Sequence, residues 1–452
     1  MTTRAALRQR SCAWGAALFL SVVMVAGCSG ASPSSRRVET RETLAAQAYV
    51  WGAPLVVSTR TYASLARLIG VNQLFWQSRL ADPSTRLIVA PNVDTLYSVA
   101  VLDLRAGPMS LTVPAVTDRY YTYQFLDSWT EAFAYVGTRA TGGRAGTWVI
   151  TPPGWNGAIP AGASHISAPT PLVFLLGRFL VHDESDIANV ATIRQRVRLD
   201  PLGAPTRPPP LAPASGTPQS VAQAGASFFD ELGDDLVLDP PTSARDRAAL
   251  TRFASLGVAA GRHPAGSTTR EALARGVVQG EAQITAATAA AKVVNGWSTR
   301  LDVGRYGSDF ILRAAVARTA WGANIAAEAV YPVSRNDAGS RPYSGSSRYV
   351  MHFDAGALPP VRAFWSLTLY GLDGFLVPNN AHRYAIGDRT PSLRRNADGS
   401  LDIFIQHEPP PGHESNWLPS PAAPFTLMTR MYLPEPAVLD GQYRLPGVQR
   451  VG

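Results

Sequence analysis

The sequence predicts an α+β protein, mainly β, with two antiparallel jelly-roll-like β-sandwich domains bridged by a helical segment. Short segments in which apolar and polar residues alternate occupy residues 86–180 and the last third of the chain. Such alternation, interrupted by closely spaced turn residues, is typical of strands in a sandwich or barrel. Between these two regions, the apolar residues recur with the period of helices.

An N-terminal helix is expected over residues 40–68. Leu44, Ala48 and Trp51 recur at helical spacing, and Thr40 is a suitable N-cap because its hydroxyl can accept a hydrogen bond from the first turn. Pro54 lacks the N–H that an interior helical residue donates, so it either kinks this helix or begins a second one.

The clearest strand pattern is at residues 120–125. Tyr121, Tyr123 and Phe125 share one face, and Gln124 lies on the other. Further strands are expected at 109–113, 148–150, 349–353, 365–369, 401–405 and 425–431. Helices are expected at 184–197, 228–238, 246–256, 267–294 and 310–330, and the Pro-rich stretch 201–218 is expected to be an exposed loop or an ordered wrap.

The N-terminus resembles a bacterial lipoprotein signal peptide. Arg4, Arg8 and Arg10 form a positive region, and the apolar run 13–26 after it is too short to span a bilayer comfortably. The run VAGC at 25–28 resembles a lipobox, in which Val25 replaces the preferred leucine. This resemblance implies cleavage before Cys28, a diacylglycerol on its sulfur, and an extracytoplasmic protein anchored to the cell membrane. An ordinary secretory signal or an uncleaved anchor is the alternative.

Cleavage at this position would also constrain the chemistry. It removes Cys12, so the mature chain would hold only the lipidated Cys28, with no disulfide and no thiol for catalysis or metal binding. It also removes three arginines, which lowers the formal net charge from +8 to +5. The remaining arginines are scattered rather than clustered, so no nucleic-acid partner is expected.

These observations divide the chain into five segments. Residues 1–27 are the signal peptide and 28–39 a flexible Gly/Ser/Pro-rich tether. Residues 40–180 comprise the N-terminal helix and first β-sandwich, 181–332 the helical middle with the Pro-rich loop, and 333–452 the second β-sandwich.

Several motifs resemble one bacterial family, whose two halves are catalogued as domains of unknown function twelve fifty-four (N-terminal) and twelve fourteen (C-terminal). The first half is marked by APNVDTLYS at 90–98 and RYYTYQFLD at 119–127, and the second by FWSLTLY at 364–370, NWLP at 416–419 and RMY at 430–432. GRYG at 304–307 and residues 324–332 lie between them. The resemblance implies two jelly-roll sandwiches bridged by helices and supplies no established activity.

Two polar groups in the first half are candidate sites. Asn92, Asp94 and Tyr97 precede an apolar segment, and Asp94 could serve as a catalytic acid or base. The alternative is an Asx-turn, in which Asn92 and Asp94 bond nearby backbone N–H groups. Gln124 and Asp127 could bind a ligand if their strand face lines a cavity, and carry no function if that face meets solvent.

The second half offers Arg383, Asn416, Trp417 and Arg430 as ligand-binding candidates. The forked guanidinium of Arg383 or Arg430 suits a carboxylate or another anion. Arg430 lies in an otherwise apolar strand, and a structural ion pair with an acid such as Asp402 or Asp373 is the alternative.

Other chemistries are disfavoured. The chain has no GxSxG elbow, no P-loop and no dinucleotide-binding glycine fingerprint. Histidine spacings such as HxxxH or HExxH are also missing, so we expect neither a metal nor a cofactor, although His407 and His413 next to glutamates are worth inspecting.

The leading hypothesis is a lipid-anchored protein that binds a small molecule or glycan between its two β-sandwiches. The alternative is an enzyme, a hydrolase or lyase, in which Asp94 is the acid or base and Arg383 and Arg430 orient an anionic substrate. A scaffold for envelope assembly is a third possibility. The oligomeric state is not predictable from these features.

Overall fold

A computed structural model describes residues 40–86, 89–290 and 292–452. The signal peptide, the tether and Cys28 lie outside the described residues. Thr40–Gly452 form one unit. Within the part of the chain that the structure describes, none of the helices combines the length and the apolarity that crossing a membrane requires.

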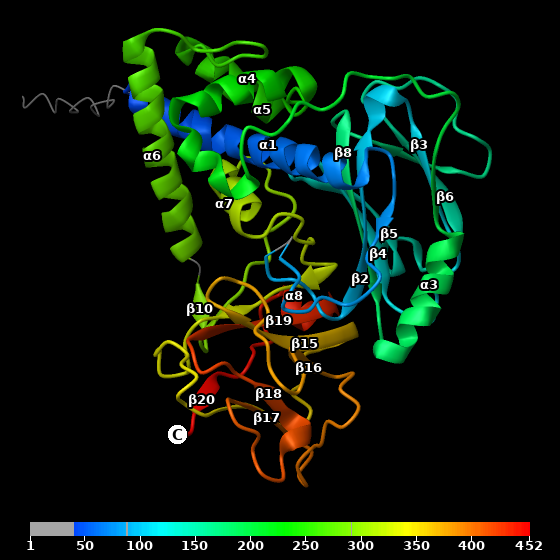
Figure 1. Ribbon diagram of the computed structural model, residues 1–452, viewed down its shortest axis with the longest axis vertical. Coiled ribbons are helices and arrows are strands. Elements are labelled where there is room, and N and C mark those ends of the chain that lie inside the picture. Colours follow the sequence, from blue (N-terminus) through cyan, green and yellow to red (C-terminus); the bar gives the residue numbers. More distant parts are fainter. Residues whose placement is uncertain (1–39, 87–88, 291) are drawn as a thin grey trace, which may run out of the picture. The chain divides into compact units, whose positions relative to one another are not determined.

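Helix α1 (Arg41–Ile69) is the axis of a helical layer (Figure 1). It begins as predicted at Thr40, whose hydroxyl accepts a hydrogen bond from the Thr43 backbone N–H at 3.1 Å. The helix continues through Pro54, so a second helix does not begin there. Trp51 and Leu55 of α1 pack in one core with Leu232 of α4 (Phe228–Leu238). The layer also contains α5 (Ala244–Phe253), α6 (Ser267–Ala289) and α7 (Phe310–Thr319).

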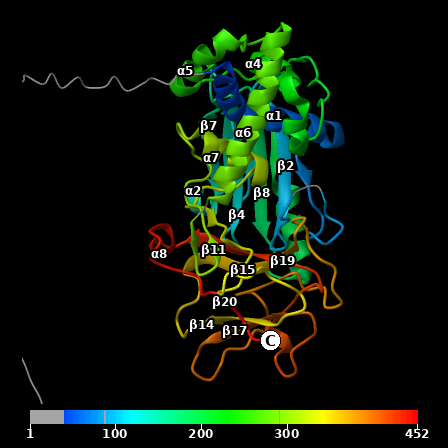
Figure 2. The ribbon, with the colours of Figure 1, turned by 90° about the vertical axis from the view of Figure 1, so that its left-hand side faces the viewer.

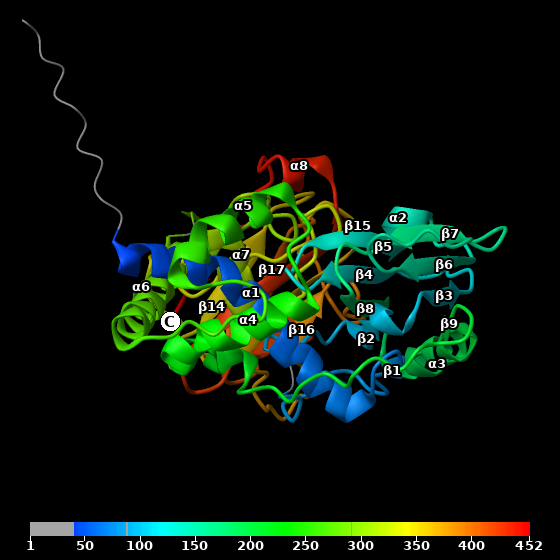
Figure 3. The same cartoon turned by 90° about the horizontal axis from the view of Figure 1, so that it is seen from above.

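The first β-sandwich consists of two sheets around one core. The larger sheet is antiparallel, with the order β1-β2-β8-β4-β5, and the smaller has the order β7-β6-β3-β9. Tyr121, Tyr123 and Phe125 point into the core between the sheets, as predicted. Figure 3 shows the two sheets as neighbouring layers. The strands are β1 (Phe75–Trp76), β2 (Thr95–Asp103), β3 (Met109–Val113), β4 (Tyr121–Asp127), β5 (Ala132–Gly137), β6 (Gly146–Thr151), β7 (Ser164–Ser167), β8 (Leu172–Leu180) and β9 (Arg198–Pro201).

The outer face of the larger sheet is also covered. Phe174 of β8 packs against Trp321, at a ring-centroid distance of 4.5 Å, and against Tyr62 of α1. Every residue of β8 is buried as a result. Polar side chains on this face, Gln124 among them, therefore lie inside the protein and not in solvent.

The second β-sandwich has the same two-layer plan. One sheet has the order β10-β11-β13-β19-β15-β16, with β12 also paired to β19, and the other has the order β18-β17-β14-β20. Tyr349, Trp365, Ile403 and Leu427 belong to its core. The strands are β10 (Val293–Val294), β11 (Trp297–Ser298), β12 (Ala329–Val330), β13 (Val333–Ser334), β14 (Tyr349–Phe353), β15 (Val361–Gly371), β16 (Ala385–Gly387), β17 (Leu401–Gln406), β18 (Trp417–Pro419), β19 (Phe425–Pro434) and β20 (Val448–Arg450).

Two sandwiches bridged by helices confirm the predicted α+β class. The predicted helix over 310–330 is wrong in its second half, because α7 ends at Thr319 and Ala329–Val330 form β12. Gly322 has a φ of +81°, a left-handed conformation that suits glycine and does not continue a helix. Pairing with β19, in which Ala329 faces Tyr432, overrides the helical propensity of this segment.

Elements cross both of the domain boundaries proposed at 180 and 332. Strand β9 pairs with β3 of the first sandwich, and β10, β11 and β12 join the second sandwich. Helix α1 shares its core with the helices of the middle segment. The remaining short elements are η1 (Leu104–Ala106), α2 (Thr138–Thr141), η2 (Glu184–Asp186), α3 (Ile187–Arg196), η3 (Pro218–Ser227), η4 (Ala254–Leu256), η5 (Glu414–Asn416) and α8 (Pro436–Leu439).

Candidate functional site

The family-like motifs of the two halves meet where the first sandwich contacts β15 and β19 of the second (Figure 2). Asn92, before β2, donates a 2.7 Å hydrogen bond from Nδ2 to the hydroxyl of Tyr432 on β19. Tyr370 at the end of β15 donates to the Pro91 carbonyl at 2.8 Å. The backbone before β2 is therefore held by side chains of the C-terminal half.

Asp94 is part of this contact and is 4% exposed. Its Oδ2 accepts a 2.7 Å hydrogen bond from the Ser366 hydroxyl, and its Oδ1 accepts from Arg389. The Asp94 backbone N–H also donates to Oδ1 of Asn92 at 2.6 Å, which is the bond of the predicted Asx-turn. Residues 92–94 therefore form both the Asx-turn and part of the contact between the two domains.

Arg178, on the outer face of β8, is a second charged group at the contact. Its guanidinium donates to Oε1 of Gln124 at 3.0 Å, to Oδ1 of Asn324 at 3.1 Å and to the Gly322 carbonyl at 2.7 Å. Its Cζ lies 5.9 Å from the ring centre of Tyr97. All three hydrogen-bond acceptors are neutral, although Arg178 is only 6% exposed.

Arg430 reaches the contact from the opposite side, on β19. It donates to the Thr368 hydroxyl at 2.8 Å, to the Tyr370 hydroxyl at 2.6 Å and to the Ala90 carbonyl at 2.9 Å. It is 3% exposed, and its acceptors are neutral too. The predicted alternative of an ion pair with Asp402 or Asp373 is wrong, since Asp373 pairs with Arg86 and Asp402 with His352.

Five tyrosines surround these two arginines. The charges of both guanidiniums act to lower the pKa of Tyr97. Burial is the larger effect, and it raises that pKa. Burial likewise raises the pKa of each of the other tyrosines in this set for which a shift is resolved, so they carry a hydroxyl proton at neutral pH. We call the set the arginine–tyrosine cluster: Arg178, Arg430, Tyr97, Tyr120, Tyr331, Tyr370 and Tyr432.

The two other guanidiniums that border the cluster are balanced by carboxylates. Arg389 pairs with Asp94, and Arg139 donates from Nε to Glu328 at 2.5 Å. Glu328 also accepts a 2.9 Å hydrogen bond from the Tyr120 hydroxyl. Among the described residues, none places a carboxylate within 4.0 Å of Arg178 or Arg430, so the cluster itself has two positive charges without a contacting anion.

Asp127 lies apart from the cluster, at the end of β4. Together with Trp129, Glu131 and Arg305 it lines a cavity of about 470 Å³. The structure therefore separates Gln124 from Asp127, although the sequence places them three residues apart. Gln124 is fully buried in the interdomain contact, where its amide donates to the Ala323 carbonyl at 2.8 Å.

Arg383, Asn416 and Trp417 are also outside the cluster. Arg383 donates to the backbone carbonyls of Glu414 and Trp417, both at 2.8 Å. Asn416 bonds the backbone of Arg394, and the Trp417 indole donates to the Gln406 carbonyl at 2.8 Å. These contacts fix loops of the second sandwich, so Arg383 does not join Asp94 and Arg430 around one ligand.

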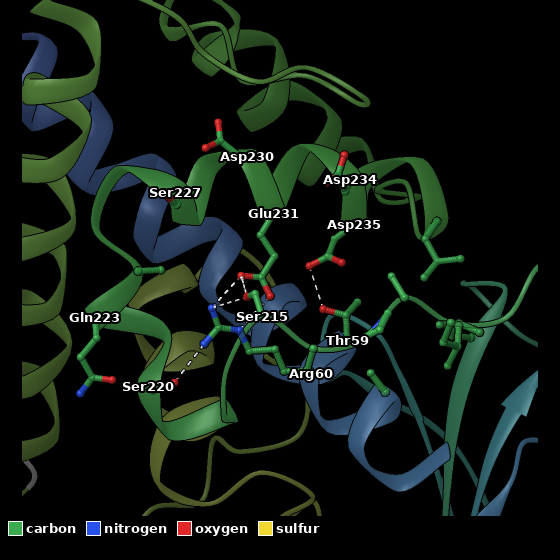
Figure 4. A pocket seen from close by; sticks show the side chains of 18 residues that line it. Thr59, Arg60, Ser215, Ser220, Gln223, Ser227, Asp230, Glu231, Asp234 and Asp235 are labelled. Atoms are coloured by element: carbon green, nitrogen blue, oxygen red, sulfur yellow. Dashed lines mark hydrogen bonds and ion pairs between the residues drawn. The ribbon is translucent and has the colours of Figure 1, made fainter. Parts of the chain in front are cut away.

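A larger cavity, of about 610 Å³, lies between α1, α4 and the Pro-rich stretch (Figure 4). Arg60 in its wall is 2% exposed and donates to both carboxylate oxygens of Glu231, at 2.8 and 2.6 Å. It also donates to the Thr217 carbonyl and the Ser215 hydroxyl, at 3.0 and 3.1 Å. Arg60 thereby ties the end of the Pro-rich stretch to the helices, which favours the ordered wrap over a free loop.

Sequence reasoning missed Arg178, Arg389 and Ser366. The signal for Arg178 was available, because it is the only charged residue in the apolar strand LVFLLGRFL. A charge in such a strand requires polar partners or a ligand if it is buried. Arg389 and Ser366 gave no comparable signal, since their roles depend on the contact between the two halves.

Two models of protein families match the chain. One, described as protein of unknown function DUF1254, matches residues 71–201, and the other, described as protein of unknown function DUF1214, matches residues 328–436. The order of the two halves is the predicted one. Asn92, Asp94 and Arg178 lie in the first match, and Arg430 and Tyr432 in the second. No curated protein matches the chain.

Two solved structures are similar to this chain, and the first of them shows the same fold. The VPA0106 protein from Vibrio parahaemolyticus is 22% identical, with a TM-score of 0.72, and the match covers 91% of this chain and all of that one. A putative uncharacterized protein from Burkholderia cenocepacia is 15% identical, with a TM-score of 0.48, over 90% of this chain and 88% of that one.

Proposed function

Because this chain belongs to the family that pairs DUF1254 with DUF1214, and neither description assigns an activity, we propose from the geometry that it binds a small anionic molecule between its two β-sandwiches. A small organic carboxylate is the proposed ligand. The supporting observation is the pair of buried guanidiniums, Arg178 and Arg430, whose hydrogen-bond acceptors are all neutral.

Burying the charge of Arg178 and Arg430 costs free energy. Moving an ion from water into a protein interior costs several kcal/mol unless an opposite charge and hydrogen bonds compensate it. Neutral carbonyls and hydroxyls accept from the terminal nitrogens of Arg178 and Arg430 but do not cancel their charge, and Asp94, which acts on Arg430 through its charge, is already paired with Arg389. A bound carboxylate supplies the missing charge, and hydrogen bonds between ionised partners are about twice as strong as neutral ones.

The surrounding tyrosines suit the same ligand. Tyr120 and Tyr370 already donate to Glu328 and to the Pro91 carbonyl, but the other phenols can donate to carboxylate oxygens, and the rings provide an apolar wall for the rest of a small molecule. Tyr97 and Tyr331 are the cluster members with partly exposed side chains, so they are the best placed to meet a ligand.

Thermal stability in the presence of small anions tests this proposal. Acetate, succinate, benzoate and inorganic phosphate should be titrated against the protein at constant ionic strength. We expect at least one carboxylate to raise Tm, since a ligand that binds only the folded state stabilises it by mass action. The Arg178→Gln and Arg430→Gln variants should lose most of that shift, and Arg86→Gln, which removes an exposed guanidinium, should keep it.

The outcomes separate the ligand classes. A shift with phosphate alone would replace the carboxylate by a phosphate ligand and contradict this version. No shift with any anion, or a shift that both glutamine variants retain, would overturn the anion site. The enzyme alternative receives less support, because both carboxylate oxygens of Asp94 already accept hydrogen bonds from Ser366 and Arg389.

We also propose that the protein is anchored by lipid on Cys28 on the extracytoplasmic face of the cell membrane. The lipobox-like run at 25–28 supports this proposal. The full-length protein should partition into the detergent phase of a Triton X-114 extract and incorporate labelled palmitate. Cys28→Ser should abolish both, and an unlabelled wild-type protein in the aqueous phase would contradict the anchor.

A further inference from the structure

The cavity at the end of β4 brings together three segments that the interdomain cluster does not use. Asp127 ends β4 and residues 129–133 come after it, Arg245 lies at the start of α5, and Arg305 and Gly307 belong to the GRYG run at 304–307. The cavity measures about 470 Å³, within the range of pockets that hold small molecules. None of its lining residues belongs to the arginine–tyrosine cluster.

Asp127 in the cavity wall has one free carboxyl oxygen. Its Oδ1 accepts hydrogen bonds from the backbone N–H groups of Trp129 and Glu131, at 3.0 and 2.8 Å. Its Oδ2 receives no hydrogen bond from the described residues, although the side chain is 6% exposed. Because Oδ1 already accepts from two N–H groups and burial raises the pKa of Asp127 to about 8, the acid proton belongs on Oδ2, where it is free to bond a ligand in the cavity.

Two further features of this loop are not explained by contacts within the protein. The indole N–H of Trp129, which is 3% exposed, has no hydrogen-bond partner in the structure. Thr130 has a φ of +69°, which is unfavourable for a β-branched residue. Strained backbone persists where surrounding contacts enforce it, and it occurs frequently at binding sites.

Arg245 and Arg305 provide positive charge at the exposed side of the same cavity. Neither guanidinium has an ion-pair or hydrogen-bond partner among the described residues. Burial raises the pKa of Glu131, and this effect is larger than the opposing effect of the Arg245 charge. The Glu131 carboxylate accepts a hydrogen bond from the Tyr306 backbone N–H at 3.1 Å. The cavity therefore has guanidiniums at its opening, a carboxyl group with a free oxygen in its wall, and the partly exposed ring of Phe133 beside them.

We propose that this cavity binds a sugar acid, a pyranose-sized polyol with one carboxylate. The carboxylate pairs with Arg245 and Arg305, the O–H at Oδ2 of Asp127 donates to a ring hydroxyl oxygen, and the apolar face of the sugar packs on Phe133. Arginine forks match carboxylates, a protonated carboxyl group donates to a hydroxyl oxygen, and an aromatic ring covers C–H groups.

Calorimetric titration with D-glucuronate tests the proposal, with D-glucose and cyclohexanecarboxylate as partial ligands. We expect glucuronate to bind about tenfold or more tightly than either, because each partial ligand lacks one charged or hydrogen-bonded contact. The double variant Arg245→Ala/Arg305→Ala and the variant Asp127→Ala should each weaken glucuronate binding about tenfold. Arg207→Ala, an exposed arginine in the Pro-rich stretch, is the matched control and should leave binding unchanged.

The double variant also separates this site from the interdomain cluster. Both of its substitutions are at exposed positions, so the protein should fold, and circular dichroism verifies this for Asp127→Ala as well. Glucuronate binding that survives the double variant would place the sugar acid elsewhere and overturn the proposal. No glucuronate binding to the wild type, or equally tight binding of cyclohexanecarboxylate, would also overturn it.

Discussion

Asn92 and Tyr432 are 340 positions apart in the sequence and are joined by a buried 2.7 Å hydrogen bond from the amide Nδ2 to the phenol oxygen. One residue precedes strand β2 of the larger N-terminal sheet, and the other is on strand β19 of the C-terminal sandwich. The family motifs that contain them therefore recognise each other. A buried polar group without a partner is costly, so this contact specifies how the two halves fit together.

Tyr432→Phe should destabilise the protein by about 1–2 kcal/mol, because it leaves the buried amide of Asn92 without an acceptor. Chemical denaturation measures this free energy of unfolding. Tyr121→Phe is the matched control, since the Tyr121 hydroxyl is also buried but has no hydrogen-bond partner in the structure. Removing that hydroxyl should be neutral or slightly stabilising, and equal losses for both variants would contradict the specific role of the Asn92–Tyr432 bond.

Double-mutant cycles should distinguish two ion pairs that both join the halves. Asp94–Arg389 has side chains that are 5% and 21% exposed, whereas those of Asp373–Arg86 are 57% and 54% exposed. We expect a coupling energy of about 3 kcal/mol for the first pair and less than about 1 kcal/mol for the second, because solvent screens exposed pairs. Similar couplings for the two pairs would show that burial does not decide the strength of these contacts.

Stability should fall as pH rises from 5 to 8. Burial, opposed by backbone hydrogen bonds, raises the pKa of Asp127 to about 8, and burial raises that of Asp239 to about 7. The folded state therefore holds these protons more tightly than the unfolded chain, whose carboxyl groups titrate near 3.8. The stabilisation is complete below that value and is lost as pH rises through 7 and 8. Tm measured across this range should decline less in Asp127→Asn, and a parallel decline would contradict the assignment.

Gly276→Ala should destabilise the helical layer although alanine favours helices. A Cβ at Gly276 of α6 would lie 2.4 Å from the Cβ of Ala45 and 2.8 Å from its carbonyl carbon on α1. Overpacking of this kind costs about 1–3 kcal/mol, more than the gain of about 1 kcal/mol in propensity. Ala282→Gly, at an exposed position of α6, measures the propensity alone, and a more stable Gly276→Ala variant would contradict the close packing.

Some elements were predictable because their signals are local. Thr40 caps the first helix, and the alternation of Tyr121, Tyr123 and Phe125 gives both the strand and its core face, since these patterns depend on neighbouring residues only. The second half of the 310–330 helix was mispredicted because a partner strand distant in sequence competes for the same backbone. Pro54 was misjudged in part, since tertiary packing sustains the helix around it.

The sequence by itself determined the α+β class, the two-sandwich plan and the family motifs, because side-chain periodicity and short motifs depend only on residues that are close together in the sequence. Only the tertiary structure decided which residues meet: it joined Asp94 to Arg389, brought Arg178 toward Arg430, and separated Gln124 from Asp127. Hydrogen bonds and charge pairs act through space at about 3 Å, and no pattern along one strand reports what faces it from residues hundreds of positions away.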